Sequence, residues 1–247
     1  GLESWLVDHI VIEGGPGDTT CWQTLTDMLG RTWAHESGQH LTIARFAIDS
    51  GFETSAVYGW ARAVGFAQVA PVKGLEGFNR ASPVTGPTYV DATVGGKRLR
   101  RGARLWSVAT STFKAETYRF LRQERPTPED IATGASFPPG TVHLPSWADG
   151  EWLKQLTAEQ LVTVKSRRGF TKLEWQKLRE RNEALDCRVY ARAAAWIAGA
   201  DRWSDARWQE LERQLAVETE GSATEATAQP APRPSARRRT VRSSYMG

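Results

Sequence analysis

Apolar residues fall into two patterns along the chain: short dense runs that predict strands, and spacings of three and four that predict helices. The predicted strands are Ser4–Glu13, Leu41–Ile48, Ala67–Val72 and Thr141–Leu144. The predicted helices are Asp18–Ala34, Thr54–Val64, Ser111–Arg122 and Arg179–Ala200. The run Leu41–Ile48 is apolar on both faces except at Arg45, which is typical of a strand covered by helices on both sides. The order strand, helix, strand therefore predicts an α/β fold.

The segments between these elements have weaker patterns. Gly, Thr and Arg recur with little alternation over Asn79–Arg104, which we interpret as a hairpin or an irregular insertion. We expect Pro126–Gly140 to be a loop and Thr157–Val164 to be helical or mixed. Arg179–Ala200 begins polar and becomes nearly continuous Ala, Val, Tyr, Trp and Ile, so its second half is expected to be buried.

The C-terminal part of the chain changes in composition. After about Val217 it is rich in Glu, Thr, Ala, Pro and Ser, and the arginines Arg237–Arg239 follow. Such a segment cannot bury enough apolar surface to offset the entropy of the chain. We therefore expect a folded domain over residues 1–205 and a disordered tail over residues 206–247. The basic end of the tail suits docking on an acidic partner, and a solvated or nonspecifically DNA-binding end is an equally good interpretation.

The composition is that of one domain with appendages: 247 residues, of which 40% are hydrophobic and 24% charged. No apolar run approaches the roughly 18 residues that span a bilayer, so we expect no membrane insertion. Cys21 and Cys187 are far apart and form no CxxC, which argues against a disulfide framework or a zinc cluster and favours a reducing cytoplasm. Because the chain starts on a dense apolar run without Met, we expect further sequence upstream.

Charge changes this picture only slightly. The net charge is +4, from 32 basic and 28 acidic residues. This mild excess favours a polyanionic partner but does not by itself identify DNA. No GxxxxGK[ST] phosphate loop occurs, so the sequence contains no ATPase motif of that kind.

Candidate chemistry lies at three acids. Asp49 ends the predicted strand Leu41–Ile48, and Glu183 and Asp186 lie three residues apart at the start of the last predicted helix. Asp186 precedes a stretch too apolar to tolerate an unpaired charge. If Asp49 and Asp186 lay about 4 Å apart, their repulsion would be roughly 4 kcal/mol at an effective dielectric of 20, which a divalent cation between them would relieve. Acids on a strand end and on a facing helix suit two-metal phosphodiester hydrolysis.

A structural interpretation of the same acids stays open. Asp49 could form a turn or cap a helix, and Glu183 and Asp186 could be acids of a first helical turn that interact with the helix dipole. The residues alone do not decide between these interpretations.

Several ordered motifs resemble one protein family. RNEALDCRVYARAAA (Arg181–Ala195) is similar to a motif near the end of lambda-type terminase large subunits of tailed phages. AIDSGFETSAVYGWAR, VAPVKG and VATSTFKAETYRFL, which start at Ala47, Val69 and Val108, resemble further motifs of that family in the same order. With SWLVDHIVIEG and TVHLP, the resemblance runs from about residue 3 to residue 203. One motif alone would be weak, whereas several in the same order are specific.

The resemblance implies a ribonuclease H-like nuclease domain, a mixed sheet flanked by helices, with the first strands of that fold missing. In this family three acids bind two Mg²⁺ or Mn²⁺ ions, and Asp49 and Asp186 match two of them. The acid of the first strand has no counterpart here, so the fragment by itself is expected to be weakly active or inactive. Glu183 belongs to the motif and could assist catalysis. Lys73, Lys114 and Arg181 are candidates for contacts with DNA phosphates.

The resemblance also implies a biological setting. The expected activity is endonucleolytic cleavage of concatemeric viral DNA during genome packaging in the host cytoplasm. The expected partners are double-stranded viral DNA, the terminase small subunit, the portal protein of the procapsid and further copies of the same chain, with ATP bound only by an upstream domain. Two alternatives remain: a non-catalytic DNA-binding or portal-docking module, and a ribonuclease H-like resolvase or integrase.

Overall fold

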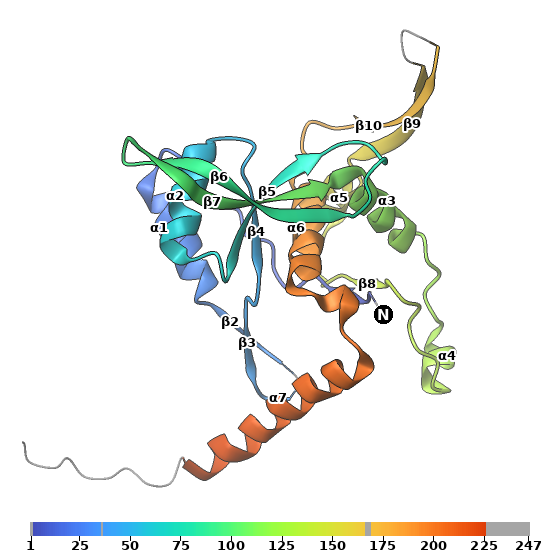
Figure 1. Cartoon of the computed structure of the whole chain (residues 1–247). Helices are drawn as coiled ribbons and strands as arrows, with labels where there is room; N and C mark the ends of the chain where they lie inside the picture. Colours follow the sequence, from blue (N-terminus) through green and yellow to red (C-terminus); the bar gives the residue numbers. More distant parts are fainter. Residues whose placement is uncertain (1, 36, 166–168, 226–247) are drawn as a thin grey trace, which may run out of the picture.

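A four-stranded mixed sheet forms the centre of the fold (Figure 1). The computed structural model describes residues 2–35, 37–165 and 169–225. The strands of the sheet, in spatial order, are β4 (Phe46–Asp49), β5 (Val69–Leu75), β7 (Lys97–Ala109) and β6 (Val84–Val94). β4, β5 and β7 are parallel to one another, and β6 pairs with β7 in the antiparallel sense. The α/β class expected from the sequence is confirmed.

Helices cover both faces of this sheet (Figure 1). The four principal helices are α1 (Thr19–Leu29), α2 (Thr54–Val64), α3 (Thr110–Leu121) and α6 (Glu183–Ala198). Successive residues of β5 point to opposite faces, because Val69 packs with residues of α1 and α2 and Ala70 packs with residues of α3 and α6. Val69–Val72 are all buried, as a strand between two helical layers requires.

Local sequence accounts for the ends of the helices. Asp18 caps α1 by accepting a hydrogen bond from the backbone N–H of Thr20 at 2.9 Å. α2 spans the predicted residues and buries its apolar face against the sheet. α6 ends at Gly199, whose φ of 96° lies in the left-handed region that glycine adopts freely. The second half of α6, which was expected to be buried, is buried only in part: Ala193 and Ala194 are buried, whereas Ala191 and Ala198 are exposed.

One predicted strand is much shorter than expected. Of Ser4–Glu13, only β1 (Ser4–Trp5) is a strand, and it pairs in parallel with β8 (Val142–His143) rather than with the central sheet. Beyond β1, the exposed Val7 and Val11 lie outside any strand. A strand needs a neighbour for its backbone groups, and an apolar pattern alone does not supply one.

The predicted strand Leu41–Ile48 is interrupted. Its first part belongs to β3 (His40–Thr42), which forms a hairpin with β2 (Thr32–Ala34), and its last part belongs to β4. The break includes Arg45, whose guanidinium donates to the carbonyl oxygen of Phe66 at 3.1 Å. The arginine that interrupts the apolar pattern therefore marks the point where the chain passes from one sheet to the next.

Two weakly patterned segments are β-hairpins. Asn79–Arg104 contains the β6–β7 hairpin, which was one of the two interpretations of its sequence. Thr157–Val164 was expected to be helical or mixed, and it is mostly β9 (Glu159–Lys165), which pairs with β10 (Thr171–Lys177). The helix in this region, α5 (Gly150–Leu156), lies just upstream. Pairing with β10, the next strand along the chain, outweighed the preference of the segment alone. The short helix α4 (Pro128–Ala132) lies within the predicted loop.

The expected start of the disordered tail is corrected by the structure. After η1 (Ala200–Arg202), α7 (Asp205–Glu225) extends through residues that were expected to be disordered. Its first half is rich in Arg, Glu, Gln and Leu, which form helices readily. The remaining tail, residues 226–247, lies outside the described residues. Neither α7 nor any other helix in the described part of the chain is long and apolar enough to cross a membrane.

Candidate functional site

Asp49 is the last residue of β4, at the edge where the parallel strands of the sheet end. In open α/β sheets, ligands bind outside the carboxyl ends of the strands. The turn after Asp49 is fixed by Ser50, whose buried hydroxyl and backbone N–H both donate to the carbonyl oxygen of Val72 at 2.8 Å. The N–H of Gly51 donates to Asp49 Oδ1 at 3.1 Å. These bonds hold the carboxylate at the sheet edge, where the residue is exposed.

Helix α6 brings Asp186 and Tyr190 to this edge. The two residues are four apart and therefore lie on the same side of the helix. The Tyr190 hydroxyl is hydrogen-bonded to the carboxylate of Asp49. Burial raises the pKa of Tyr190, and the charges of Asp49 and Asp186 raise it further. The phenol consequently stays protonated and donates to Asp49.

Gly74 on β5 leaves the room that Tyr190 needs. A Cβ atom at position 74 would lie 2.9 Å from the Tyr190 hydroxyl and 2.9 Å from Thr110 Cγ2, closer than carbon atoms in proteins approach such groups. The glycine is required here by close approach and not by its backbone conformation, because its φ is not in the left-handed region. The bond between Tyr190 and Asp49 thus depends on a missing side chain on the neighbouring strand.

The pKa of Asp186 is raised above the usual range of a carboxyl group. The largest cause is burial, and the negative charges of Glu159 and Asp49 act in the same direction. The charges of Lys114 and Lys177 oppose this shift without cancelling it. An ionised Asp186 is therefore short of positive charge in its surroundings.

Glu159 completes a group that we call the carboxylate cluster: Asp49, Glu159 and Asp186. Glu159 is buried, and both of its carboxylate oxygens accept from Lys114 Nζ, at 2.7 and 2.8 Å. The buried Asn182 joins it to Asp186, because Asn182 Nδ2 donates to Glu159 Oε1 at 3.0 Å and to Asp186 Oδ2 at 3.1 Å. Lys177 Nζ donates to Asn182 Oδ1 at 2.9 Å, which fixes the orientation of the amide. Two acids and an amide are thus held as one unit.

Sequence reasoning missed Glu159, Asn182 and Tyr190. Tyr190 and Asn182 each lie four residues from Asp186 inside the quoted motif, so helical spacing could have pointed to both. Glu159 had no local signal, because its segment was not expected to be a strand and its partners come from distant elements. Only the tertiary structure reveals it.

The other predicted site residues have surroundings of their own. Glu183 is exposed and its Oε2 lies 3.5 Å from Arg181 Nε at the surface. A spacing of three residues turns Glu183 by roughly 60° from Asp186 about the helix axis, which accounts for the difference. In place of the expected phosphate contact, Lys114 has an internal partner in Glu159, and its side chain is only 13% exposed. Lys73 is exposed on β5, one residue beyond the Val72 that pairs with Asp49.

The chemistry of the cluster suits a hard divalent cation. Asp49 and Asp186 offer carboxylate oxygens, the ligands that Mg²⁺ and Mn²⁺ prefer, and the raised pKa of Asp186 indicates a deficit of positive charge. Within the described residues, however, no three His, Cys, Asp or Glu side chains form a complete metal site. The donors thus fit such an ion in kind, and a full set of ligands requires a further group.

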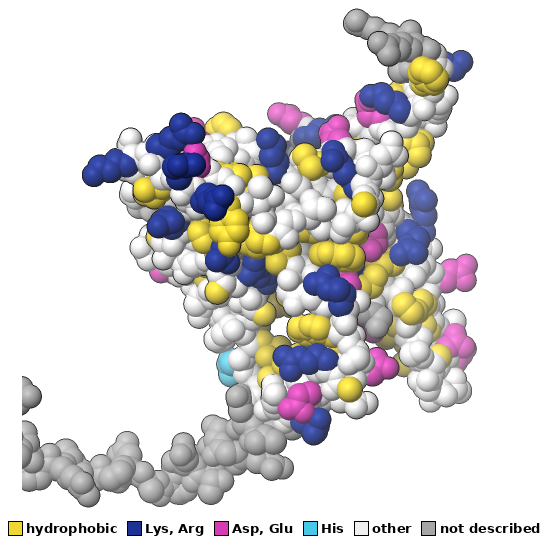
Figure 2. All heavy atoms as spheres, in the orientation of Figure 1, with side chains coloured by type: hydrophobic (Ala, Val, Ile, Leu, Met, Phe, Trp, Pro, Cys, Tyr) yellow, Lys and Arg dark blue, Asp and Glu magenta, His cyan; other side chains and the backbone are white. Residues whose placement is uncertain are grey.

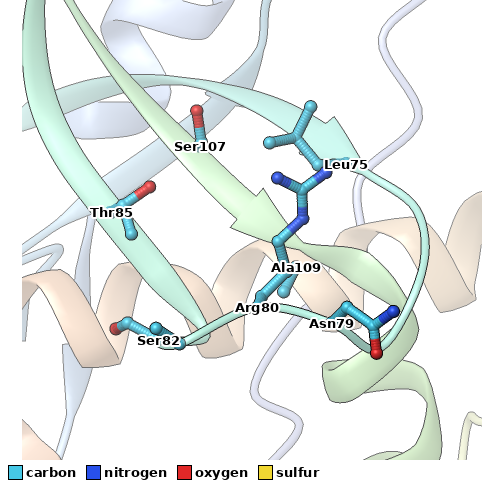
Figure 3. A pocket seen from close by; sticks show the side chains of 8 residues that line it. Leu75, Asn79, Arg80, Ser82, Thr85, Ser107 and Ala109 are labelled. Atoms are coloured by element: carbon cyan, nitrogen blue, oxygen red, sulfur yellow. The ribbon is translucent and has the colours of Figure 1, made fainter.

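A separate cavity of about 240 Å³ lies between the ends of β5 and β7 and the loop that leads into β6. Figure 3 shows Arg80 and Asn79 on this loop, with Ser107 and Thr85 on the facing strands. None of the carboxylates of the cluster lines this cavity. We therefore assign the candidate chemistry to the carboxylate cluster and not to the cavity.

Comparison with known proteins gives consistent matches. Residues 1–208 match the family described as "Terminase large subunit gpA, endonuclease domain". The chain is 34% identical over 232 residues to the terminase large subunit of Escherichia phage lambda, which covers 91% of this chain and 32% of that protein. It is 33% identical over 208 residues to the terminase large subunit of Enterobacteria phage P21, which covers 82% of this chain and 30% of that protein. The chain thus spans about a third of the length of these relatives. No solved structure matches the chain.

Proposed function

The chain belongs to the terminase large subunit gpA endonuclease domain family, and on that premise we propose that its carboxylate cluster cuts double-stranded viral DNA with the help of divalent cations. The family membership confirms the resemblance found in the sequence. The observation that supports the proposal is the raised pKa of Asp186 on α6: burial is the largest cause, and the charges of Glu159 and of Asp49, at the end of β4, add to it. A buried carboxylate that lacks enough positive charge is typical of a functional site.

Asp49 and Asp186 are the residues that would hold Mg²⁺ or Mn²⁺. Such ions, when bound in pairs, activate water and stabilise the leaving oxygen of a phosphodiester. The surrounding residues orient the two acids: Tyr190 donates to Asp49, and Asn182 donates to Asp186 Oδ2. Because Asn182 occupies Oδ2, the other oxygen of Asp186 is the one available to a cation.

The third acid of the site comes, in this proposal, from a strand upstream of residue 1. The resemblance to the family places an acid on the first strand of a ribonuclease H-like fold, and the mixed sheet flanked by helices is compatible with that fold. Glu159 is not a good substitute, since both of its oxygens are bound by Lys114 and one is also bound by Asn182. An extended chain is therefore expected to cleave more efficiently than residues 1–247.

The wider setting follows from the same family. We propose that the substrate is concatemeric viral DNA cut during packaging in the host cytoplasm, and that an ATPase on the same polypeptide binds ATP. The partners would be the terminase small subunit, the procapsid portal and further copies of this chain. The basic tail would contribute to portal docking. Lys73 and Arg181, both exposed, would contact phosphates. Glu183 would assist DNA cleavage from its exposed position.

The test is cleavage of supercoiled plasmid DNA in Mn²⁺ or Mg²⁺ by the chain alone and by the chain joined to its upstream segment. We expect Asp49→Asn and Asp186→Asn to reduce cleavage by about a thousandfold, since each removes a ligand that no neighbour replaces. Asp27→Asn, an equivalent change on the exposed surface of α1, should leave cleavage unchanged. Full activity of either site variant would exclude the assigned roles.

One observation favours a second function, a DNA-binding or portal-docking module without catalysis. It is the lack of a complete set of three metal-binding side chains among the described residues. The same assay separates the two functions: if the extended chain binds DNA and leaves it intact at all metal concentrations, the binding module is the better description.

A further inference from the structure

The β6–β7 hairpin contains an unusual share of the charge of the molecule. Residues 84–109 include five basic side chains, Lys97, Arg98, Arg100, Arg101 and Arg104, and one acid, Asp91. Their net charge of +4 equals the formal net charge of the whole chain, so the rest of the sequence is neutral in sum. Figure 2 shows Lys and Arg side chains gathered over the end of this hairpin, which projects beyond the sheet in Figure 1.

The hairpin has a tight turn and, near it, a bulge. Its turn, Gly95-Gly96, has φ values of 56° and 76°, as the tight two-residue turn of a hairpin requires. Near the turn a bulge interrupts the pairing, and Arg101 has a φ of 52°, a conformation that a side chain other than glycine rarely adopts. Asp91 holds this conformation, since its Oδ1 accepts from the N–H of Arg101 at 3.0 Å. Strain of this kind persists where the surroundings fix it, commonly at functional sites.

The two faces of the hairpin have different partners. On one face, Ala92 and Ala103 are buried against residues of α2. The pairing registers put Leu99 on that same face, so Arg98, Arg100 and Arg104 project from the other, which we call the basic face. Along β7 the basic face continues into Trp106 and Val108, which pack beneath α3 and α6. The basic face and Asp186 therefore lie on the same side of the sheet.

The basic face also carries an aromatic ring, and it has too few acids to balance the positive charge of its arginines. Tyr89 lies directly opposite Arg104 in the register, is 55% exposed, and has its ring 5.6 Å from the Arg104 guanidinium carbon. Asp91 accepts from Arg98 at 2.7 Å, whereas Arg100 and Arg104 have no acidic partner within the described part of the chain. Neighbouring arginines that lack acidic partners attract a polyanion such as DNA. Each phosphate that they neutralise releases counterions from the DNA, which favours binding.

We propose that the basic face of the β6–β7 hairpin binds the phosphate backbone of duplex DNA, at a position separate from the carboxylate cluster. In the strand pairing, Asp49 is the partner of Val72, and Val72 is the partner of Trp106. Trp106 therefore marks the position of the site on β7, and Arg100 is six residues away from it along this strand. At about 3.3 Å per residue this is roughly 20 Å, or about six base pairs of B-DNA. The proposal rests on the proposed function only for the choice of DNA as the polyanion.

The experiment is fluorescence anisotropy of a labelled 30-base-pair duplex of mixed sequence, titrated with the 247-residue chain in EDTA at several NaCl concentrations. The test variant is Arg100→Gln with Arg104→Gln. The matched control is Arg122→Gln with Arg125→Gln, which removes the same charge from exposed positions after α3. Thermal unfolding of each protein checks that the fold is intact.

We expect the test variant to bind about tenfold more weakly at 0.15 M NaCl, and its plot of log affinity against log salt to be less steep by about 2, since each lost phosphate contact removes about 0.9 counterion. The control should change affinity by less than twofold. Equal affinity of test variant and wild type, equal losses in test and control, or no binding by the wild type would overturn the proposal. The first result would favour an acidic protein as the partner of this face.

The EDTA separates this proposal from the nuclease function. Without divalent cations the assay measures binding alone, so no step of the proposed cleavage contributes to the readout. If the extended chain never cleaves DNA but the test variant still loses affinity, the nuclease proposal fails and the role of the basic face stands.

Discussion

Two groups of charges lie on the helix pair α3 and α6, and they differ in how completely their charges are matched. In the first, which we call the arginine cluster, Arg192 Nε lies 2.7 Å from Glu116 Oε1 and Arg192 Nη2 lies 2.8 Å from Asp201 Oδ1. These three side chains are 9%, 19% and 10% exposed, and the guanidinium also lies over the ring of Phe113. In the carboxylate cluster, Lys114 and Lys177 leave Asp186 with a raised pKa.

The difference shows how one helix can contribute both to stability and to function. Asp186 and Arg192 are six residues apart on α6, and both are partly or fully buried. In the arginine cluster both acids form an ion pair with Arg192, so removing Arg192 takes that cation away from two largely buried acids. The carboxylate cluster keeps a deficit of positive charge, so removing an acid relieves repulsion while it removes a ligand. Substitutions in the two clusters should therefore have opposite effects on stability.

The largest expected effect is in the arginine cluster. We expect Arg192→Met to lower the free energy of unfolding by about 3 kcal/mol, because Glu116 and Asp201 would lose the cation that they share. Urea denaturation measures the change. Arg213→Met, at a site where the arginine side chain is 73% exposed and pairs with Glu210, should change the free energy by less than about 0.5 kcal/mol. A loss below about 1 kcal/mol in Arg192→Met would show that the cluster is not a stabilising unit.

The second effect concerns the orientation of Asp186. We expect Asn182→Ser to weaken Mn²⁺ binding by about tenfold, because a serine is too short to join Glu159 to Asp186, while its preference for helix N-caps keeps the start of α6 intact. Calorimetric titration of the 247-residue chain measures the affinity, and Asn79→Ser, at an exposed position, is the control.

Unchanged Mn²⁺ affinity in Asn182→Ser would refute the orienting role of the amide. If the wild type and Asp186→Asn both bind no Mn²⁺, the metal site itself is wrong, and the result then concerns the proposed function rather than Asn182.

The third effect tests the packing around Asp49. We expect Gly74→Ala to destabilise the chain by about 1 kcal/mol, because the added Cβ would lie 2.9 Å from both Tyr190 Oη and Thr110 Cγ2. In a Tyr190→Phe background the same change should cost less, since one of the two close contacts is gone. A double-mutant cycle in urea measures the coupling. Equal costs in the two backgrounds would mean that Thr110 alone limits the space.

The smallest effect is a stabilisation. Because the folded-state pKa of Asp186 is raised, the folded chain binds more protons than the unfolded chain above the usual carboxyl range, and its stability falls as the pH rises through that interval. Asp186→Asn lacks this penalty. Without metal we expect its unfolding midpoint at pH 7 to exceed that of wild type by about 2 °C and the difference to vanish near pH 3. A lower midpoint at pH 7 would contradict the deficit of positive charge.

Part of the site was predictable from sequence because its signals are local. Asp49 follows a dense apolar run, and Asp186 precedes one, so the ends of a strand and the start of a helix were visible at both positions. Tyr190 lies four residues after Asp186, which is a helical spacing visible in the sequence. The sequence did not show that Tyr190 contacts Asp49. Glu183 shows the limit of such reasoning, since it belongs to the same motif and yet pairs with Arg181 at the surface.

The amino-acid sequence by itself determined the α/β class, the helices α2, α3 and α6 and the family, because these depend on apolar periodicity and on motifs within short segments. It also pointed to Asp49 and Asp186, whose role as site residues stays a prediction. Only the tertiary structure decided that Ser4–Glu13 is mostly not a strand and that Glu159 is buried beside Asp186. The reason is that strand pairing and buried charge depend on distant partners. A strand requires a neighbouring strand for its hydrogen bonds, and a buried acid requires a cation. The residues adjacent in sequence do not identify either partner.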